Sequence, residues 1–418
     1  MFENVIGHDH VTARLRKEVE GESLPASMLF FGPPYAGKLT TALELARGLT
    51  CLTGGARWNC SCKSCEMQRL LIHPDTLLLG GRYFWHEITA CADVLARIRK
   101  PPAQYLYARA VRKLTRRFDP LLWEGTEPKL KAVGSLVQEA EDLLAGLLPG
   151  EELPEEPKLA KTLARIGELA RKIVPAASDT IPIGQIRRVT AWAYTTTAGP
   201  KKVIIIESAD RMLESARNAL LKVLEEPPRG IHFILTTTRR AALMPTILSR
   251  LRPYHFPERD ETGSREVLAK IFREEVEASV AGGMGPAETA ATVSAGSRSY
   301  RTLRDYFLAW DETDIDRLRG LAGRFLSLVV AGRAAPLEDE LLAAVATDAS
   351  FRPFLEELLG LLQASLKEAR DGQIGVGISR IAVWNRLIRE AAAQHEAYNQ
   401  GPALLVESLY YRMKEGLV

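Results

Sequence analysis

Residues 28–41 combine a short apolar stretch, a Gly/Pro loop and the first residues of a helix. The stretch reads Met28-Leu29-Phe30-Phe31-Gly32-Pro33-Pro34-Tyr35-Ala36-Gly37-Lys38-Leu39-Thr40-Thr41. A strand, such a loop and a helix in this order are typical of a phosphate-binding loop, in which backbone N–H groups and the helix dipole hold phosphate. Lys38 would contact the terminal phosphates as a point charge. An ordinary Gly/Pro turn is the alternative interpretation.

The loop lacks the hydroxyl that normally holds Mg²⁺. The full pattern ends Gly-Lys-Ser/Thr, but Leu39 follows Lys38 here. Leucine cannot bind a hard cation, which requires oxygen ligands, and Thr40 lies about 100° further around the helix. Tyr35 also stands where related loops usually have a third glycine. We therefore expect the loop shape without metal-dependent hydrolysis.

A second departure follows the apolar run 203–206. This run, Val203-Ile204-Ile205-Ile206, predicts a buried parallel strand. In phosphate-loop ATPases such a strand ends in an aspartate that orients Mg²⁺, followed by a glutamate that polarises the attacking water. Here the two positions are Glu207 and Ser208. Glu207 retains a carboxylate on a longer side chain, whereas Ser208 is not basic enough to activate water.

Four of the five cysteines lie within fifteen positions. Cys51, Cys60, Cys62 and Cys65 have the spacing C-x8-C-x-C-x2-C. Clustered thiolates in a reducing cell are typical of structural zinc, which prefers four tetrahedral ligands. A turn must bring Cys60 and Cys62 together, and free thiols or a partly used site are the alternative. We expect Cys91 to be an inert buried thiol.

Length and composition indicate a globular protein of about three domains. The chain has 418 residues, 46% hydrophobic residues and a net charge of +3, so its charge alone does not indicate a nucleic-acid partner. No apolar run approaches the roughly 18 residues of a membrane span, and the start does not resemble a signal peptide. We therefore expect a cytoplasmic protein with no membrane contact.

Residues 83–180 differ in character from the flanking sequence. Their apolar residues recur at helical spacing, which predicts a helical insertion. Within it, residues 97–117 are strongly basic, with Tyr105 and Tyr107 interleaved. A solvated helix face balanced by the acidic turn at 149–157 is favoured over a contact with DNA phosphates. At 181–187 the alternation of apolar and polar residues returns, and from about residue 258 the pattern is helical.

Several strings resemble the clamp-loader branch of AAA+ proteins. They are Val5-Ile6-Gly7, residues 32–38, the cysteine cluster, His73-Pro74-Asp75, Ala219-Leu220-Leu221-Lys222-Val223-Leu224-Glu225-Glu226-Pro227-Pro228 and Pro245-Thr246-Ile247-Leu248-Ser249-Arg250. The resemblance extends over residues 1–82 and 181–258. It implies an α/β AAA+ P-loop domain at 1–258, with helices flanking a parallel sheet, a zinc module at 51–65 and a helical insertion at about 83–180. A small helical lid at 259–313 and an all-α collar at 314–418 would follow.

The resemblance also implies roles for individual residues. Arg250 matches the arginine that reaches the nucleotide of a neighbouring subunit, where a permanently charged guanidinium can stabilise a transferred phosphoryl group. Val5 and Ile6 match the adenine-side contacts. Thr238, or Thr237, matches a strand-end sensor of nucleotide state. Arg304 matches the arginine of a second sensor, with a helix-surface arginine as the alternative.

The family acts as a pentameric ring of related subunits that places the sliding β clamp on primed DNA. Leu39, Glu207 and Ser208 depart from the family at three steps of ATP hydrolysis. We therefore expect a subunit of the DNA polymerase III assembly that is not catalytic alone, contributes Arg250 in trans and has lost ATPase activity. Whether ATP or ADP still binds remains open. The alternatives are an ATP-hydrolysing motor of the same machine and a helicase-like remodeller, which the motifs at 224–228 and 249–250 disfavour.

Overall fold

A computed structural model describes most of the chain. The described residues are 1–81, 85–123, 128–176, 180–274, 300, 302–310, 315–331, 336–345, 348–370, 378–398 and 400–415. The chain divides into two compact units, Met1–Trp310 and Asp311–Val418. Much of the predicted lid, including 275–299, lies outside the described residues.

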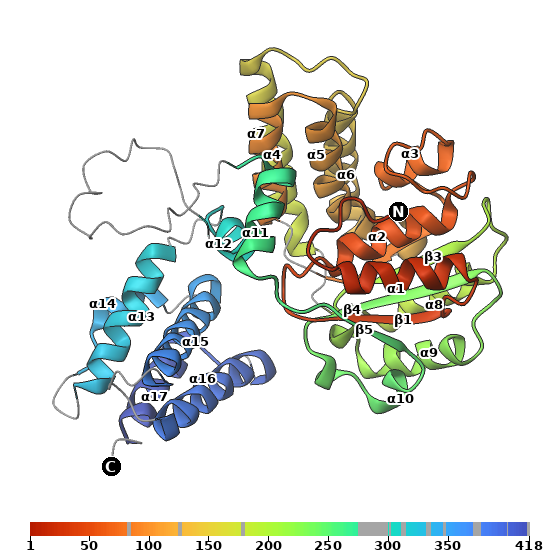
Figure 1. The fold of residues 1–418 in the computed structure, drawn as a ribbon. Helices are drawn as coiled ribbons and strands as arrows, with labels where there is room; N and C mark the ends of the chain where they lie inside the picture. The colour runs from red at the N-terminus through yellow and green to blue at the C-terminus, as the bar shows by residue number, and fades with distance from the viewer. Residues whose placement is uncertain are drawn as a thin grey trace. The chain divides into compact units, whose positions relative to one another are not determined.

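A five-stranded parallel sheet forms the centre of the first unit (Figure 1). Its strands are β1 (Ser27–Phe31), β2 (Thr76–Leu79), β3 (Lys202–Ile206), β4 (Ile231–Thr237) and β5 (Arg252–His255). They lie in the order β2-β3-β4-β1-β5, and every neighbouring pair is parallel. The predicted α/β fold is therefore confirmed. All residues of β3 are buried, as the run of β-branched residues predicts.

The two faces of the sheet belong to different apolar clusters, because successive strand residues point to opposite faces. Val203 and Ile205 pack in one cluster with residues of α1 (Asp9–Glu20) and α2 (Lys38–Thr50). Ile204 and Ile206 pack in the other cluster with residues of α8 (Ile183–Ala193) and α9 (Glu214–Glu225). Helices thus cover both faces of the sheet.

One sequence-based expectation at 181–187 is wrong. Only Ile181 makes a β-bridge, to Met212, and α8 begins at Ile183. Ile186, Val189 and Ala193 are buried at helical spacing, so the apparent alternation at the start of this segment is the first turn of an amphipathic helix.

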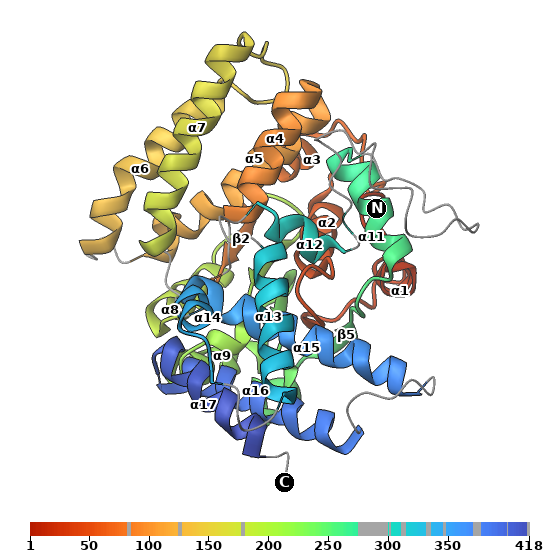
Figure 2. The ribbon, with the colours of Figure 1, turned by 90° about the vertical axis from the view of Figure 1, so that its left-hand side faces the viewer.

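The insertion consists of four long helices that stand together beyond the sheet (Figure 2). They are α4 (Trp85–Ile98), α5 (Pro101–Thr115), α6 (Pro128–Ala145) and α7 (Glu156–Ile173), with short 3₁₀ turns η1 (Arg116–Phe118) and η2 (Pro120–Leu122) after α5. Helix α4 packs against α5 and α7, and α6 packs against α7. Their apolar residues share one continuous cluster with a face of the sheet, so the insertion is part of the main core.

Short helices complete the first unit. They are α3 (Lys63–Arg69), η3 (Val174–Ala176), η4 (Ala209–Arg211), η5 (Arg240–Ala242), α10 (Pro245–Leu248), α11 (Glu261–Val267), η6 (Leu268–Phe272) and α12 (Leu303–Leu308). Tyr35 of the Gly/Pro loop stacks on Phe307 of α12, with ring centroids 5.1 Å apart. Helix α12 is therefore in contact with the loop that follows β1.

The second unit is helical throughout its described residues. Its helices are α13 (Ile315–Val330), α14 (Asp339–Val345), α15 (Asp348–Arg370), α16 (Ile378–Tyr398) and α17 (Pro402–Glu415). They enclose a separate apolar cluster that contains Phe325, Phe354, Trp384 and Tyr410. Across the described parts of both units, no helix has the length and apolar character needed to cross a membrane.

Candidate functional site

The loop after β1 has a backbone that requires glycine at two positions. Gly32 has φ 153°, and a Cβ on it would lie 1.9 Å from the carbonyl oxygen of Phe256. Gly37 has φ 84° and is the N-cap of α2. Tyr35 adopts a left-handed conformation with φ 57° although it is not glycine. The loop thus leads directly into the positive end of a helix, the geometry that favours an anion.

Lys38 is almost fully buried and is turned back onto the loop. Its Nζ donates hydrogen bonds to the carbonyl oxygens of Gly32 at 2.7 Å and Pro33 at 2.5 Å. Burial lowers the pKa of Lys38 to about 8, and the charge of Arg259 lowers it further while Glu207 opposes the shift. The predicted phosphate-contacting ammonium group therefore bonds to the loop's own backbone.

The residues after Lys38 form helix rather than a metal site. Leu39 is buried in the apolar cluster beneath the sheet. Thr40 is half-buried, and the hydroxyl of Thr41 donates to the carbonyl oxygen of Gly37 at 3.0 Å. Of the other predicted loop residues, Pro34 is exposed and Ala36 is buried. The residues present do not fit a Mg²⁺-nucleotide site of the usual kind, because Leu39 offers no oxygen.

Glu207, the other candidate metal ligand, forms an ion pair with the insertion. Nη2 of Arg117 lies 2.5 Å from a Glu207 carboxylate oxygen, and the Arg117 side chain is 4% exposed. Ser208, at the position of the water-polarising residue, has φ 53° and is the N-cap of the 3₁₀ turn η4, which begins at Ala209. The carboxylate at the end of β3 is therefore engaged by a guanidinium.

Thr237, at the end of β4, is the strand-end threonine that contacts Asp210 of η4. It is buried, and its hydroxyl donates to Asp210 at 2.6 Å. Asp210 also pairs with Arg239 at 3.0 Å. Thr238, the first choice from the sequence, is exposed just beyond β4. All residues of β4 are buried, so the end of the strand at Thr237 separates these two environments.

Two further side chains lie against the loop. Nε of Arg259 donates to the carbonyl oxygen of Ile6 at 3.0 Å, and its Nη1 donates to that of Tyr35 at 2.6 Å. His8 is 1% exposed and packs edge-on against Phe256, with ring centroids 5.2 Å apart. Burial lowers the pKa of His8 to about 4, and the charge of Arg259 adds to this. Of the two predicted adenine-side residues, Ile6 therefore contacts a cationic group and Val5 is buried.

Arg250 lies at the other edge of the sheet. Arg250 comes just before β5, whose first residue, Arg252, pairs with Met28 near the start of β1. The last residue of β5, His255, pairs with Phe31, which directly precedes the loop. A strand of five residues separates the two edges by about 15 Å. Nε of Arg250 donates to Glu225 at 2.9 Å, and Nη1 donates to the carbonyl oxygen of Thr246 at 2.6 Å.

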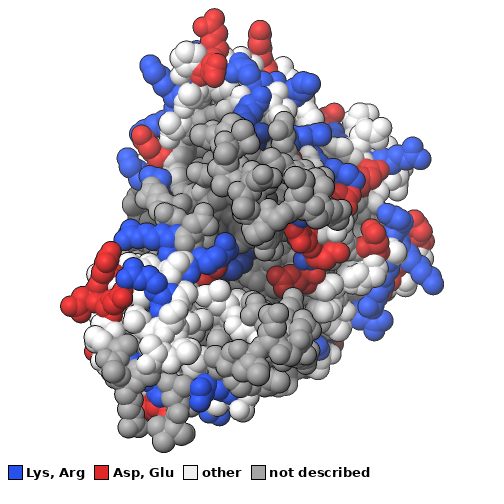
Figure 3. Space-filling view, turned by 60° about the vertical axis from the view of Figure 1, so that its left-hand side comes forward, with Lys and Arg blue, Asp and Glu red and all other residues white. Residues whose placement is uncertain are grey.

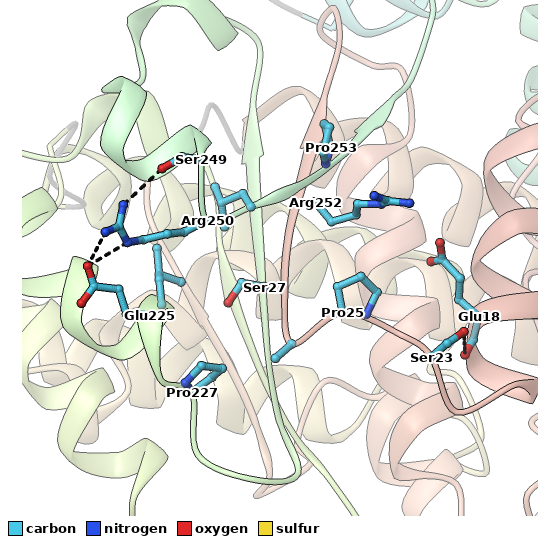
Figure 4. Close-up of a pocket in the computed structure, with 13 residues that line it drawn as sticks. Glu18, Ser23, Pro25, Ser27, Glu225, Pro227, Ser249, Arg250, Arg252 and Pro253 are labelled. Carbon is cyan, nitrogen blue, oxygen red and sulfur yellow. Dashed lines mark hydrogen bonds and ion pairs between the residues drawn. The ribbon is translucent and has the colours of Figure 1, made fainter.

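The Arg250–Glu225 pair forms one wall of an open hollow of about 690 Å³ (Figure 4). The hollow is lined by Glu18, Ser23, Pro25, Ala26, Ser27, Leu224, Glu225, Pro227, Ser249, Arg250, Leu251, Arg252 and Pro253. Glu225 belongs to the Leu-Glu-Glu-Pro-Pro string and Arg250 to the Ser-Arg string, so the two most specific motifs of the sequence meet here. The hollow lies at the amino edge of the sheet, away from the loop after β1.

The four clustered cysteines converge in space. Their sulfur atoms all lie within 4.8 Å of one another, with Cys51 3.9 Å from Cys60 and 4.0 Å from Cys62. Four zinc–sulfur bonds of about 2.3 Å in tetrahedral geometry would place the sulfurs about 3.8 Å apart. Cys62 caps α3 and Cys65 lies in its first turn, which supplies the required turn. The residues therefore fit a tetrahedral metal site.

Buried polar groups hold the cysteine loop in place. Arg47 of α2 is fully buried, pairs with Glu44 and donates to the carbonyl oxygens of Ala56 and Arg57, both at 2.8 Å. Its Nη1 also lies 3.7 Å from the sulfur of Cys65. Burial raises the pKa of the Cys65 thiol, and so do hydrogen bonds with the neighbouring thiols. Because metal binding requires thiolates, it would release protons here.

His73 is not among the clustered donors. Its Nδ1 accepts a hydrogen bond from the backbone N–H of Asp75 at 3.0 Å, and its Nε2 lies 2.9 Å from the hydroxyl of Ser64. His73 therefore stabilises the turn that leads into β2. Arg304, the candidate second-sensor residue, is half-buried on α12.

The basic segment is only in part the solvated face that the sequence favours, since Arg97, Arg99 and Lys100 are exposed. Four of its side chains, those of Arg109, Arg112, Lys113 and Arg117, are less than a tenth exposed. Lys113 pairs with Glu87, Arg112 with Glu141 at 3.0 Å, and Arg117 with Glu207. On the face shown in Figure 3, basic and acidic side chains are interspersed among the described residues. Internal ion pairs, rather than solvent, account for much of the basic character of this segment.

Comparison with known proteins gives matches, each over part of this chain, to subunits of DNA polymerase III. Residues 158–260 match the family described as DNA polymerase III, delta subunit. The tau/gamma subunit of DNA polymerase III from Haemophilus influenzae is 40% identical over 82 residues, which are 20% of this chain and 12% of that protein. The delta' subunit from Pseudomonas aeruginosa is 34% identical over 100 residues, 24% of this chain and 30% of that protein.

A part of this chain is therefore similar to subunits of DNA polymerase III. The matches extend to both gamma/tau and delta' subunits and do not separate the two. This chain spans less than a third of the length of each of these curated relatives. A solved structure of a gamma subunit-related protein from Thermotoga maritima aligns with 57% of this chain and 80% of its own, with 17% identity and a TM-score of 0.27.

Sequence reasoning missed four residues in or near the candidate site. Asp210, Arg117, Arg259 and His8 all lie in or beside the site. Asp210 was detectable, since it follows β3 closely. Arg117 and Arg259 are 90 and 224 residues from their partners Glu207 and Tyr35, and a single sequence gives no signal for such contacts.

Proposed function

We propose that this protein is a delta'-like subunit of the DNA polymerase III clamp loader that does not hydrolyse ATP itself. In this proposal it forms a pentameric ring with gamma/tau and delta subunits, and the ring loads the β sliding clamp on primed DNA. The chain provides Arg250 to the nucleotide site of a neighbouring gamma/tau subunit. Zinc bound by the four clustered cysteines has a structural role.

The placement of Arg250 is the observation that supports this proposal most. Arg250 lies at the amino edge of the sheet, and the chain's own phosphate-binding loop follows the carboxyl edge. An arginine side chain cannot span the intervening strand of about 15 Å. Any nucleotide that Arg250 contacts must therefore belong to another chain.

The chain's own loop supports the absence of hydrolysis. Leu39 packs in the apolar core where a metal-binding hydroxyl is needed, and Glu207 pairs with Arg117. A motor subunit of the gamma/tau type, the alternative, would require Thr40 and another acid to replace both groups. The contacts of Glu207 favour the non-hydrolysing role.

Steady-state ATP turnover tests the proposal. The purified chain should show no turnover, with or without primed DNA, and turnover that is abolished by Lys38→Ala would contradict the proposal. In the reconstituted assembly, Arg250→Ala should remove the turnover of the one site that it serves, because such arginines contribute roughly 10³–10⁵-fold at their site. Arg252→Ala, a neighbouring exposed arginine of the same hollow, is the matched control and should leave turnover unchanged.

A further inference from the structure

Arg259 bridges the two segments between which a nucleotide would bind. It lies between β5 and α11, and its guanidinium donates to the carbonyl oxygens of Ile6 and Tyr35. Ile6 belongs to the predicted adenine side and Tyr35 to the phosphate-binding loop. A Cβ added to Gly37 would lie only 2.5 Å from Nη2 of Arg259, so the guanidinium is in close contact with the loop.

The charge of Arg259 is held by neutral acceptors. Among the residues that the structure describes, its hydrogen-bond acceptors are the two carbonyl oxygens, and no carboxylate pairs with it. Burial lowers the pKa of its guanidinium to about 10. Arg259 is partly buried, and partial burial of a cation without a carboxylate partner is costly, so the hydrogen bonds to Ile6 and Tyr35 help to hold the guanidinium there.

Lys38, like Arg259, donates its hydrogen bonds to backbone carbonyl oxygens. Its ammonium group donates to Gly32 and Pro33, which are parts of the loop itself. A phosphate group would have to attract this ammonium group away from its two carbonyl oxygens. Backbone carbonyl oxygens therefore accept hydrogen bonds from both cations beside the loop, and these bonds would compete with a bound phosphate.

We propose that Arg259 closes the nucleotide site of this chain by occupying the space between Ile6 and the phosphate-binding loop. The inference builds on the proposed non-hydrolysing role and goes further, because it states that nucleotide is excluded as well as not hydrolysed. The guanidinium must leave its two carbonyl oxygens before a base and its phosphates can enter. Removing the side chain then opens the site, which retains Lys38 and the helix N-terminus as phosphate-binding groups.

A titration of the full-length chain with ATP, with and without Mg²⁺, by calorimetry tests this proposal. Arg259→Ala should bind ATP at least about tenfold more tightly than the wild type, a difference of about 1.4 kcal/mol. Arg265→Ala, which removes a half-exposed arginine on α11 paired with Glu261, is the control and should bind like the wild type. Adding Lys38→Ala to Arg259→Ala should abolish the gained binding, which would locate it in the loop.

Unchanged or weaker binding by a folded Arg259→Ala variant would overturn the proposal, and weaker binding would identify Arg259 as a phosphate ligand. Arg259→Met keeps the apolar stem of the side chain and decides the matter if the alanine variant does not fold. The two proposals fail separately. ATP turnover by the wild-type chain would contradict the non-hydrolysing role, whereas equal ATP binding without turnover by wild type and Arg259→Ala would contradict only the role of Arg259.

Discussion

His8 is the residue beside the loop whose burial has the clearest consequence for stability. Its ring is 1% exposed and packs against Phe256, and its pKa falls from 6.5 to about 4 because of burial and the nearby charge of Arg259. The folded protein therefore binds fewer protons than the unfolded chain between these two pH values. Stability must rise with pH in that window and fall as the pH is lowered through it.

We predict that His8→Phe reduces this pH dependence. Between pH 7 and 4.5 the wild type should lose about 2–3 kcal/mol more unfolding free energy than the variant, since each pKa unit corresponds to about 1.4 kcal/mol. Urea unfolding at the two pH values measures this difference, which cancels the contribution of the other histidines. His10→Phe, at an exposed position, is the control. Equal losses in wild type and His8→Phe would contradict the buried neutral imidazole.

At the scale of elements, one buried ion pair joins the insertion to the sheet. Arg117 follows α5 directly, and Glu207 follows β3. We predict that Arg117→Ala lowers the unfolding free energy by about 3–5 kcal/mol, because it removes the guanidinium from a carboxylate that is only 13% exposed. Arg116→Ala removes the neighbouring, more exposed pair with Asp119 and should cost less than about 1 kcal/mol. Urea unfolding of both variants tests the difference, and similar small losses would show that the pair does not anchor the insertion.

The cysteine loop and α3 form a second element that depends on buried charge. We predict that the purified chain contains one equivalent of zinc, that Cys62→Ser loses it, and that a chelator lowers the melting temperature of the wild type but not of that variant. Cys91, which lies apart from the cluster, provides the control, since Cys91→Ala should retain zinc. Metal analysis together with thermal unfolding measures both effects. Less than half an equivalent in the wild type would exclude the site.

Some elements of this fold can be predicted from the sequence, and others cannot. Strand β3, helix α2 and the four helices of the insertion were predictable because their apolar periodicity is local. The surroundings of the basic segment 97–117 were not predictable in this way. Whether Arg112, Lys113 and Arg117 face water depends on Glu141, Glu87 and Glu207, which lie 29, 26 and 90 residues away. A charge run looks the same in the sequence whether its partners are water or distant carboxylates.

In the candidate site, too, the features set by local sequence were predictable, and the contacts between distant residues were not. The loop and the four cysteines were predictable because their spacing alone is constrained by the chemistry of phosphate and zinc binding. The choice between Thr237 and Thr238 required the exact end of β4, and element ends are the least predictable feature of a sequence. Arg259 and Ile6 lie 253 positions apart in the sequence, so their contact can be recognised only in the folded structure.

At the scale of the whole molecule, the division into two units has a testable consequence. Residues 311–418 enclose their own apolar cluster, and Trp384, 1% exposed, donates its indole N–H to the carbonyl oxygen of Met413 at 2.9 Å. A unit with its own core can fold alone. We therefore predict that a fragment of residues 311–418 shows helical circular dichroism, a cooperative thermal transition and dispersed methyl resonances in proton NMR.

Two aromatic substitutions on this fragment separate a packed core from loosely associated helices. Trp384→Ala should lower its unfolding free energy by about 3–5 kcal/mol, since truncating a large buried side chain leaves a cavity. Tyr411→Ala, at a position that is 50% exposed on α17, should change it by about 0.5 kcal/mol or less. A fragment that is helical but melts without cooperativity, or that tolerates both substitutions equally, would show that this unit needs the rest of the chain to form its core.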